Sequence, residues 1–196
     1  MRQMKKGLTR LILATMMTLS LCACSSGGGT APILTVAGKE VILGDTGANV
    51  FPLTEFEMTI PGEGLPIGKM PGKSWLSTFM SLKKDGSSYA CLYVYNRGRE
   101  EEEVTFATIY KLSFTMHTED SESSHWAEDN VLVNGVNYFG MDANGVKETM
   151  TQFKALSEDD DYLSYKDGKY TYRFDLDDNG IVEEVEVEMK IDKSYH

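Results

Sequence analysis

Apolar and polar residues alternate in two stretches near the end of the chain. Every second position is apolar in residues 170–176 and again in residues 185–191. A period of two is typical of strands in an antiparallel sheet with one covered face and one solvated face. The two predicted strands place on their covered faces Tyr170, Tyr172, Phe174 and Leu176 in the first, and Val185, Val187, Met189 and Ile191 in the second.

Three earlier stretches have the same character. One strand is expected around residues 75–83, and a second in residues 89–95, where Ala90, Leu92 and Val94 alternate with tyrosines. The third is a long strand with one face formed by Val104, Phe106, Tyr110, Leu112 and Phe114. The pattern therefore predicts antiparallel strands in both halves of the chain.

Turn motifs recur at a fixed separation. Lys84-Asp85-Gly86 is repeated 82 positions later as Lys166-Asp167-Gly168, and Asn96-Arg97-Gly98 has its counterpart in Asp178-Asn179-Gly180 at the same offset. Glycine accepts the positive φ that tight hairpin turns require. Each pair of turns therefore predicts three antiparallel strands in a meander.

A third match precedes the strands, at an offset of 97. Val36-Ala37-Gly38 resembles Val133-Asn134-Gly135. After the second copy, Asp142 is a suitable helix cap, and the next residues carry an apolar stripe at helical spacing, formed by Val146, Met150 and Phe153. We expect this helix to cover the apolar face of the sheet.

These patterns predict an α+β, predominantly β fold of two tandem units, each a helix plus a three-stranded antiparallel meander. The first unit spans residues 34–116 and the second residues 131–196, joined by an acidic linker over residues 117–130. In the first unit Pro52 should end the helix early. Units of this size are marginal alone, so we expect them to pack together, in one sheet or in two.

The first 23 residues have the layout of an export signal. Basic residues precede an apolar run over residues 11–23 that is too short to span a bilayer. The run ends in Leu21-Cys22-Ala23-Cys24, which matches a lipobox with Cys24 as the acylated first residue of the mature chain. Residues 24–33 would follow as the lipidated cysteine and a Ser/Gly tether. We predict a lipid-anchored protein at the extracytoplasmic face of the cell membrane; the alternative is an ordinary secretory signal.

The charge of the mature chain disfavours some partners. Four of the 19 basic residues and none of the 30 acidic residues precede Cys24, which leaves a net charge of −15. A chain this acidic repels phosphate backbones and anionic lipid headgroups, so no nucleic acid is expected and membrane contact has to come from the anchor. One acyl chain binds a membrane only weakly, so the anchor is expected to carry several, such as palmitate.

Motifs that carry chemistry are scarce. After cleavage at Cys24 the mature chain keeps one further cysteine, Cys91, so no intrachain disulfide can form. Cys91 lies in an apolar run without a nearby histidine, and we expect an inert thiol rather than a nucleophile. The sequence has no phosphate-binding glycine loop, nucleophile elbow or dinucleotide fingerprint, and we predict that the protein is not an enzyme.

Residues 175–186 match the calcium loop of an EF-hand. Asp175, Asp177 and Asn179 stand at the first, third and fifth positions, and Glu186 at the twelfth. An EF-hand needs flanking helices, whereas both flanks here alternate as strands. A solvated acidic turn is therefore the preferred interpretation, and calcium binding is the alternative; no other cofactor is expected.

Two further polar stretches are interpreted as solvated. His117 and His125 lie among carboxylates in the linker, but their separation matches no standard zinc pattern. Residues 158–161 read Glu-Asp-Asp-Asp and are expected to form an exposed acidic face. A metal site at the histidines is the alternative interpretation.

Tyr89, Tyr93 and Tyr95 share one face of their predicted strand. Exposed tyrosines with acidic neighbours suit a contact surface for a protein or a glycan. The alternative is that both faces of this strand are buried.

Four features of the sequence occur together: the lipobox, the tether, the glycine-bearing helix start Phe139-Gly140-Met141-Asp142 and the run of residues 170–182. In these features the chain resembles a family of surface lipoproteins of Gram-positive gut bacteria, of the Firmicutes type. The tandem repeats are similar to the helix-plus-sheet units of the β-lactamase-inhibitor-protein-like fold and of small outer-membrane-assembly lipoproteins, although no Gly-Pro pair follows Phe153. The resemblance implies a binding or assembly role and assigns no ligand.

We therefore predict a membrane-anchored, non-enzymatic lipoprotein that binds a macromolecular partner, a protein or a glycan, at the cell surface. The alternative is an accessory lipoprotein that binds a small solute or a metal ion in the cleft between the units. A cell-wall hydrolase would need a close carboxylate pair in that cleft, to which no motif points.

Overall fold

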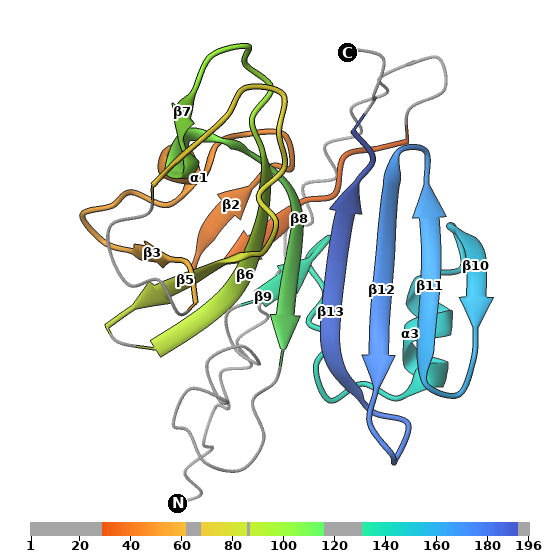
Figure 1. The fold of residues 1–196 in the computed structure, drawn as a ribbon. Helices are drawn as coiled ribbons and strands as arrows, with labels where there is room; N and C mark the ends of the chain where they lie inside the picture. Colours follow the sequence, from red (N-terminus) through yellow and green to blue (C-terminus); the bar gives the residue numbers. More distant parts are fainter. Residues whose placement is uncertain (1–28, 62–67, 86, 116–130, 192–196) are drawn as a thin grey trace, which may run out of the picture.

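The computed structural model describes residues 29–61, 68–85, 87–115 and 131–191 (Figure 1). This part of the chain is predominantly β, and its sheets are antiparallel, as the alternation predicts. The predicted signal peptide, Cys24 and the linker over residues 117–130 lie outside the described residues. The strands are β1 (Leu34–Val36), β2 (Lys39–Val41), β3 (Glu57–Thr59), β4 (Lys69–Met70), β5 (Met80–Lys84), β6 (Ser87–Tyr95), β7 (Glu102–Glu103), β8 (Thr108–Thr115), β9 (Val131–Val133), β10 (Lys154–Glu158), β11 (Tyr162–Asp167), β12 (Tyr170–Leu176) and β13 (Val182–Met189). The helical segments are α1 (Gly47–Val50), α3 (Ala143–Thr149) and the 3-10 turn η1 (Val104–Phe106).

Eight strands form one continuous antiparallel sheet. Its order in the described chain is β10-β11-β12-β13-β8-β6-β5-β3 (Figure 1). β8 from the N-terminal half pairs with β13 from the C-terminal half, which places Leu112 beside Val187 and Phe114 beside Val185. All four side chains are buried. The alternative between one sheet and two, which the sequence leaves open, is thus resolved as one sheet.

One face of this sheet is covered by α3 and by the small sheet β2-β1-β9, which lie on the same side (Figure 1). The helix begins where the sequence predicts, because the Asp142 side chain accepts a hydrogen bond from the Gly145 backbone N–H at 2.7 Å. Val146 and Met150 are fully buried beneath it. α3 ends at Thr149, so the partly buried Phe153 follows the helix instead of belonging to it.

The helix of the N-terminal half is short. α1 ends at Val50, two residues before Pro52, as predicted. It packs closely on its surroundings, since a Cβ at Gly47 would lie 3.1 Å from both the Met58 sulfur and the Thr105 carbonyl oxygen. None of the described helices is long and apolar enough to cross a membrane.

The small sheet joins matched segments from the two halves. β1 pairs with β2 through a turn at Ala37 and Gly38 (φ 51° and 73°), and the matched Asn134 and Gly135 have almost the same angles (53° and 80°). Both residues of each turn therefore have the positive φ of a type I′ hairpin. β1 also pairs antiparallel with β9, which brings the two matched segments side by side.

The expectation of a tight hairpin at Asn96-Arg97-Gly98 is wrong. β6 ends at Tyr95 and β8 begins at Thr108, and the connection between them contains β7 and η1. The matched turn in the C-terminal half is tight, with Gly180 at φ 75° between β12 and β13. In the N-terminal half, the Asn96 side chain is buried and donates a hydrogen bond to the Met70 carbonyl oxygen, 26 residues earlier in the chain. A residue at the exposed tip of a tight hairpin could not make this contact.

The long strand expected over residues 104–114 is also interrupted. Its first residues form η1, where Phe106 is 44% exposed. In β8 a bulge shifts the register, so that Tyr93 faces Lys111 while Val94 faces Ile109. The extra residue reverses the alternation before it, which puts Ile109 in the core and turns Tyr110 to the opposite face.

Candidate functional site

The second face of the large sheet carries mostly polar side chains. At its centre the thiol of Cys91, the hydroxyl of Ser113 and the carboxylate of Glu186 lie on neighbouring strands. Ser113 donates a hydrogen bond to Glu184, and Lys111 forms an ion pair with Glu186. The face opposite the core therefore carries polar side chains, as the alternation predicts, although Ser113 at its centre is only 4% exposed. Polar pairs between neighbouring strands link the side chains of this face.

The tyrosines of β6 lie on this second face. Ala90, Leu92 and Val94 are buried in the core, so Tyr93 and Tyr95 point the other way. Tyr89 lies on the same face toward the beginning of the strand and is partly exposed. Burial raises the pKa of the Tyr93 phenol, and the neighbouring Cys91, Glu186 and Glu184 raise it further.

Three aromatic residues that the sequence did not single out as site residues contact these tyrosines: Trp75, Tyr110 and Phe79, whose ring centroid lies 6.0 Å from that of Tyr93. The Trp75 ring lies 4.5 Å from that of Tyr95 and 4.7 Å from that of Tyr110, measured between centroids. Tyr110 in turn contacts Tyr93 at 6.4 Å. Trp75 is 41% exposed and covers Tyr95, which is only 6% exposed. We call four of these side chains the aromatic cluster: Trp75, Tyr93, Tyr95 and Tyr110.

Trp75 does not belong to the strand expected around residues 75–83. The regular strand β5 starts at Met80, and Trp75 makes an isolated bridge to Tyr95 instead. The backbone of Leu76 donates to the Val94 carbonyl at 3.2 Å, which holds this segment along the end of β6. The indole is thereby placed over the second face of the sheet.

Asn96 fixes the loops beside the aromatic cluster. Its side chain is completely buried, and its amide nitrogen lies 2.9–3.3 Å from three backbone carbonyl oxygens, those of Met70, Pro71 and Glu100. The side-chain oxygen accepts from the Gly98 backbone N–H at 2.8 Å. One buried amide therefore ties the connection after β6 to the loop after β4.

The loop after β4 is held in a single conformation by steric contacts as well. A Cβ at Gly72 would stand 2.1 Å from the Arg99 carbonyl oxygen, so only glycine fits there. The next residue, Lys73, has a φ of 55°, which is unusual for a residue with a side chain, and its N–H donates to the Gly98 carbonyl at 2.9 Å. The backbone thus fixes the start of the Lys73 side chain.

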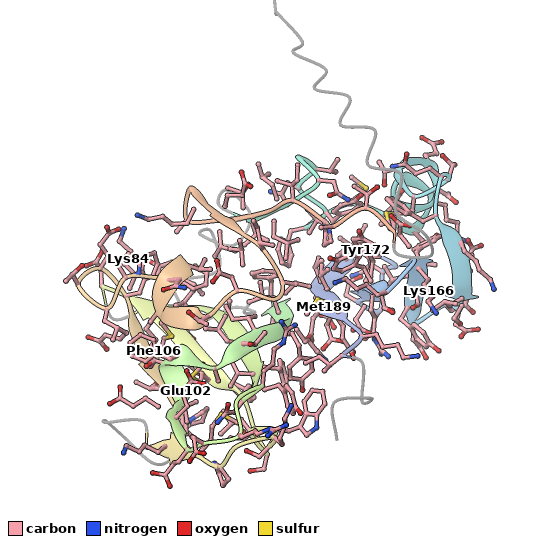
Figure 2. All side chains as sticks on the ribbon, turned by 90° about the horizontal axis from the view of Figure 1, so that it is seen from above. Lys84, Glu102, Phe106, Lys166, Tyr172 and Met189 are labelled. Carbon is pink, nitrogen blue, oxygen red and sulfur yellow. The ribbon has the colours of Figure 1, made fainter. Side chains whose placement is uncertain are left out.

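A hollow of about 450 Å³ lies beside these loops, between the ends of β6 and β13 and the turn from β11 to β12. Figure 2 shows the position of Met189, between Phe106 in the N-terminal half and Lys166 in the C-terminal half. We call this cavity the basic hollow, and it is lined by Lys73, Tyr95, Arg97, Lys169, Met189, Lys190 and Ile191. Four of its seven lining residues are cationic.

The candidate calcium ligands are not brought together. Asp177 accepts hydrogen bonds from the backbone N–H groups of Ile181 and Asn179 at 2.8 and 2.9 Å, and these bonds, that of Ile181 most strongly, lower the pKa of its carboxyl group. Asp175 pairs with the adjacent Arg173, and Glu186 pairs with Lys111. The described residues contain no group of three or more histidine, cysteine, aspartate or glutamate side chains arranged to hold a metal ion.

The acidic stretch 158–161 is exposed, as expected. It faces Asp177 and Asp178 across an open hollow of about 420 Å³ at the end of the strands opposite the basic hollow. Lys147 contributes one ion pair there, with Glu158 at 3.7 Å. The candidate zinc residues His117 and His125 lie outside the described residues.

The thiol of Cys91 is expected to react slowly. Partial burial, and then the charges of Glu184 and Glu186, raise the pKa of this thiol to about 11. At pH 8 the thiolate fraction of Cys91 is about 100-fold below that of an exposed cysteine. The thiolate of a more basic thiol is more nucleophilic, which raises the reaction rate about 10-fold and offsets part of this loss. In the mature chain carrying Cys24→Ala, we expect iodoacetamide to alkylate native Cys91 about 10-fold more slowly than the same protein in urea.

The variant Glu184→Gln serves as a control for that measurement. It removes one of the charges that raise the pKa of the Cys91 thiol, so alkylation of the native protein should accelerate. Equal rates for the native and the urea-unfolded chain would contradict the expectation, and a faster rate for the native chain would point to an activated thiol.

Comparison of the chain with protein-family models, curated proteins and solved structures found no significant match. The resemblance to surface lipoproteins and to β-lactamase-inhibitor-protein-like repeats therefore stays a prediction from the sequence. The aromatic cluster and the basic hollow are the features on which a function can be proposed.

Proposed function

We propose that the protein is a lipid-anchored extracytoplasmic lipoprotein that binds a macromolecular partner at the cell surface without acting as an enzyme. The aromatic cluster is the observation that carries this proposal. It places an exposed indole and three tyrosine rings together on the second face of the sheet, beside polar and charged side chains. Aromatic residues with a polar group are the ones that most often dominate binding surfaces.

The proposal includes two tandem α+β units, each with a helix and a three-stranded meander. The consecutive antiparallel neighbours β5-β6-β8 and β11-β12-β13 support it, as do the matched turns at Ala37-Gly38 and Asn134-Gly135. Strands at corresponding places also meet, since β1 pairs with β9 and β8 with β13. Such pairing is what two related units packed about a two-fold axis would produce.

A second candidate function is favoured by the basic hollow. Its volume of about 450 Å³ is in the range of small-molecule sites, and it lies where the two halves of the sheet meet. An accessory lipoprotein that binds a small solute would use this hollow. The metal-binding form of this candidate gains no support from the described carboxylates.

If the aromatic cluster binds the partner, replacing Trp75 should weaken binding to the cell envelope. The mature chain with Cys24→Ala should co-sediment with cell envelopes of the producing organism, and Trp75→Ala should weaken this binding about 30-fold, as expected for a central aromatic contact worth about 2 kcal/mol. Phe106→Ala is the matched control, because Phe106 is similarly exposed (44% against 41%) but lies outside the aromatic cluster. Circular dichroism would verify that both variants fold.

Treatment of the envelopes separates the two kinds of partner. Loss of binding after protease treatment would indicate a protein, and loss after periodate oxidation would indicate a glycan. Envelope binding that is absent, or that is equally strong for Trp75→Ala and Phe106→Ala, would overturn the proposal.

A further inference from the structure

We infer that the basic hollow is a binding site for the acid group of an acidic saccharide, with the sugar ring placed against the aromatic cluster. This inference rests on the proposed surface-binding function and narrows its partner to a glycan that carries a carboxylate or a phosphate. It concerns residues that come from four separate parts of the chain, near positions 73, 97, 169 and 190.

The first observation is the charge of the hollow. The mature chain would have a net charge of −15, yet four cations surround this one cavity. Among the described carboxylates, none forms an ion pair with Arg97, Lys169 or Lys190. Cations gathered in this way repel one another, and a bound anion would offset that repulsion.

The second observation is that hydrogen bonds hold the backbone segments that carry the four cationic residues. The Asn96 hydrogen bonds hold the loops that carry Lys73 and Arg97. On the other side, the Lys190 backbone N–H donates to the Lys169 carbonyl at 2.8 Å, which joins the end of β13 to the turn after β11. The ligand would therefore meet groups whose positions are already set, which lowers the entropy cost of binding.

Arg97 has a defined place in the hollow. A Cβ at Gly44 would lie 3.9 Å from the Arg97 Nη2 atom and 3.6 Å from the Met189 methyl carbon, so the guanidinium and the thioether meet over this glycine. Gly44 has a φ of 110°, a conformation that other residues rarely adopt. The planar guanidinium can bind a carboxylate or a phosphate with two parallel hydrogen bonds.

The third observation is the aromatic wall. Tyr95 lines the hollow and also contacts the exposed Trp75, so the basic hollow and the aromatic cluster share this residue. A pyranose ring presents C–H groups on one face that pack on an aromatic ring, while its substituents reach polar partners. A ring beside Trp75 and an acid group among the cations would use both parts of the site.

The shape and the surrounding charge favour a saccharide over a membrane surface. The site is a concave cavity, whereas a lipid headgroup plane would need a protruding basic surface. The glutamates at positions 100–103 follow Arg97 closely and would be pressed against the same anionic plane. A ligand with a localised acid group avoids this repulsion.

Calorimetric titration of the mature chain with Cys24→Ala tests the inference, with trigalacturonate and glucose 6-phosphate as probes. At least one of the two should bind, and its affinity should fall by about 10-fold or more in the double variant Lys169→Gln/Lys190→Gln. The matched control Lys84→Gln/Lys154→Gln removes the same charge outside the hollow and should bind as the parent does. The neutral methyl ester of trigalacturonate should bind about 10-fold more weakly than trigalacturonate if that probe is bound.

Several outcomes would overturn the inference. These are no binding of either probe, equal binding by the two double variants, and equal binding of trigalacturonate and its methyl ester. Sedimentation with phosphatidylglycerol vesicles that depends on Lys169 and Lys190, without binding of either saccharide, would assign the hollow to a lipid surface instead.

The two proposals can fail separately. If the Lys169→Gln/Lys190→Gln variant sediments with envelopes as well as the parent does, the saccharide inference fails while the binding role of the aromatic cluster stands. If the probes bind in the hollow but the parent does not bind envelopes, the surface-binding function fails and the small-solute function gains support.

Discussion

Replacing Asn96 with alanine is expected to lower the free energy of unfolding by about 3 kcal/mol, because several buried backbone groups lose their partner at once. The Asn96 side-chain nitrogen donates to three backbone carbonyl oxygens, and its oxygen accepts from one backbone N–H. No part of the side chain is exposed to water. Urea denaturation of the mature chain with Cys24→Ala, followed by circular dichroism, would measure the loss.

Two further variants sharpen that measurement. Asn96→Asp keeps the shape of the side chain but replaces the donating amide with an acceptor, so it should destabilise at neutral pH at least as much as alanine does. Asn179→Ala is the control, because Asn179 lies in an exposed turn and should cost less than about 1 kcal/mol. A loss below about 1 kcal/mol for Asn96→Ala would show that water or loop movement replaces the missing bonds.

Replacing Cys24 with alanine is expected to transfer the protein from the membrane fraction to the soluble fraction. Each buried CH₂ group of an acyl chain contributes about 0.8 kcal/mol to membrane binding, so a multiply acylated cysteine anchors its protein stably, whereas a single chain does not. Fractionation of cells expressing each form, together with metabolic labelling by palmitate, would measure the change.

Cys22→Ala is the matched control for the anchor. The bulky Leu21 precedes Cys22, whereas the small Ala23 precedes Cys24, so only Cys24 suits the lipobox. The Cys22→Ala protein should therefore remain labelled and bound to membranes. A Cys24→Ala protein that stays entirely with membranes after a high-salt wash would show that the lipoprotein assignment is wrong.

The alternation of residues was sufficient to predict most of the large sheet. Tyr172, Phe174 and Val187 are buried on the side that period two assigns to them, and the helix capped by Asp142 lies over that side. These features depend on neighbours within a few positions along the chain, which a sequence displays directly. The contact between β8 and β13 depends on register between distant segments, so the sequence could not distinguish one sheet from two.

The departures from the predicted fold have local causes that alternation cannot reveal. The bulge at β8 is defined by the partner strand and not by the residues of β8 themselves, so Tyr110 was assigned to the wrong face. Asn96 followed by Arg97 and Gly98 has the composition of a tight turn, and its buried side-chain contacts become visible only once the loop after β4 is in place.

The candidate site was only partly predictable. The outward face of Tyr93 and Tyr95 follows from their opposition to a buried apolar row. Trp75 gave no periodic signal, because it makes an isolated bridge outside any regular strand. The acidic net charge of the chain disfavoured an anionic ligand. A net charge is a sum over the whole chain, so it does not show that four cations gather around one cavity.

The pairing of β8 with β13 has a consequence for the time at which the chain can fold. β13 is the last strand among the described residues, and β1 pairs with β9 in the C-terminal half. Until the final segment has been synthesised, β8 has an open edge and the sheet cannot close, because contacts between distant positions form late and slowly. The strand order therefore predicts that the N-terminal half reaches its final packing only after β13 has been added, so a chain truncated before β13 should expose the edge of β8.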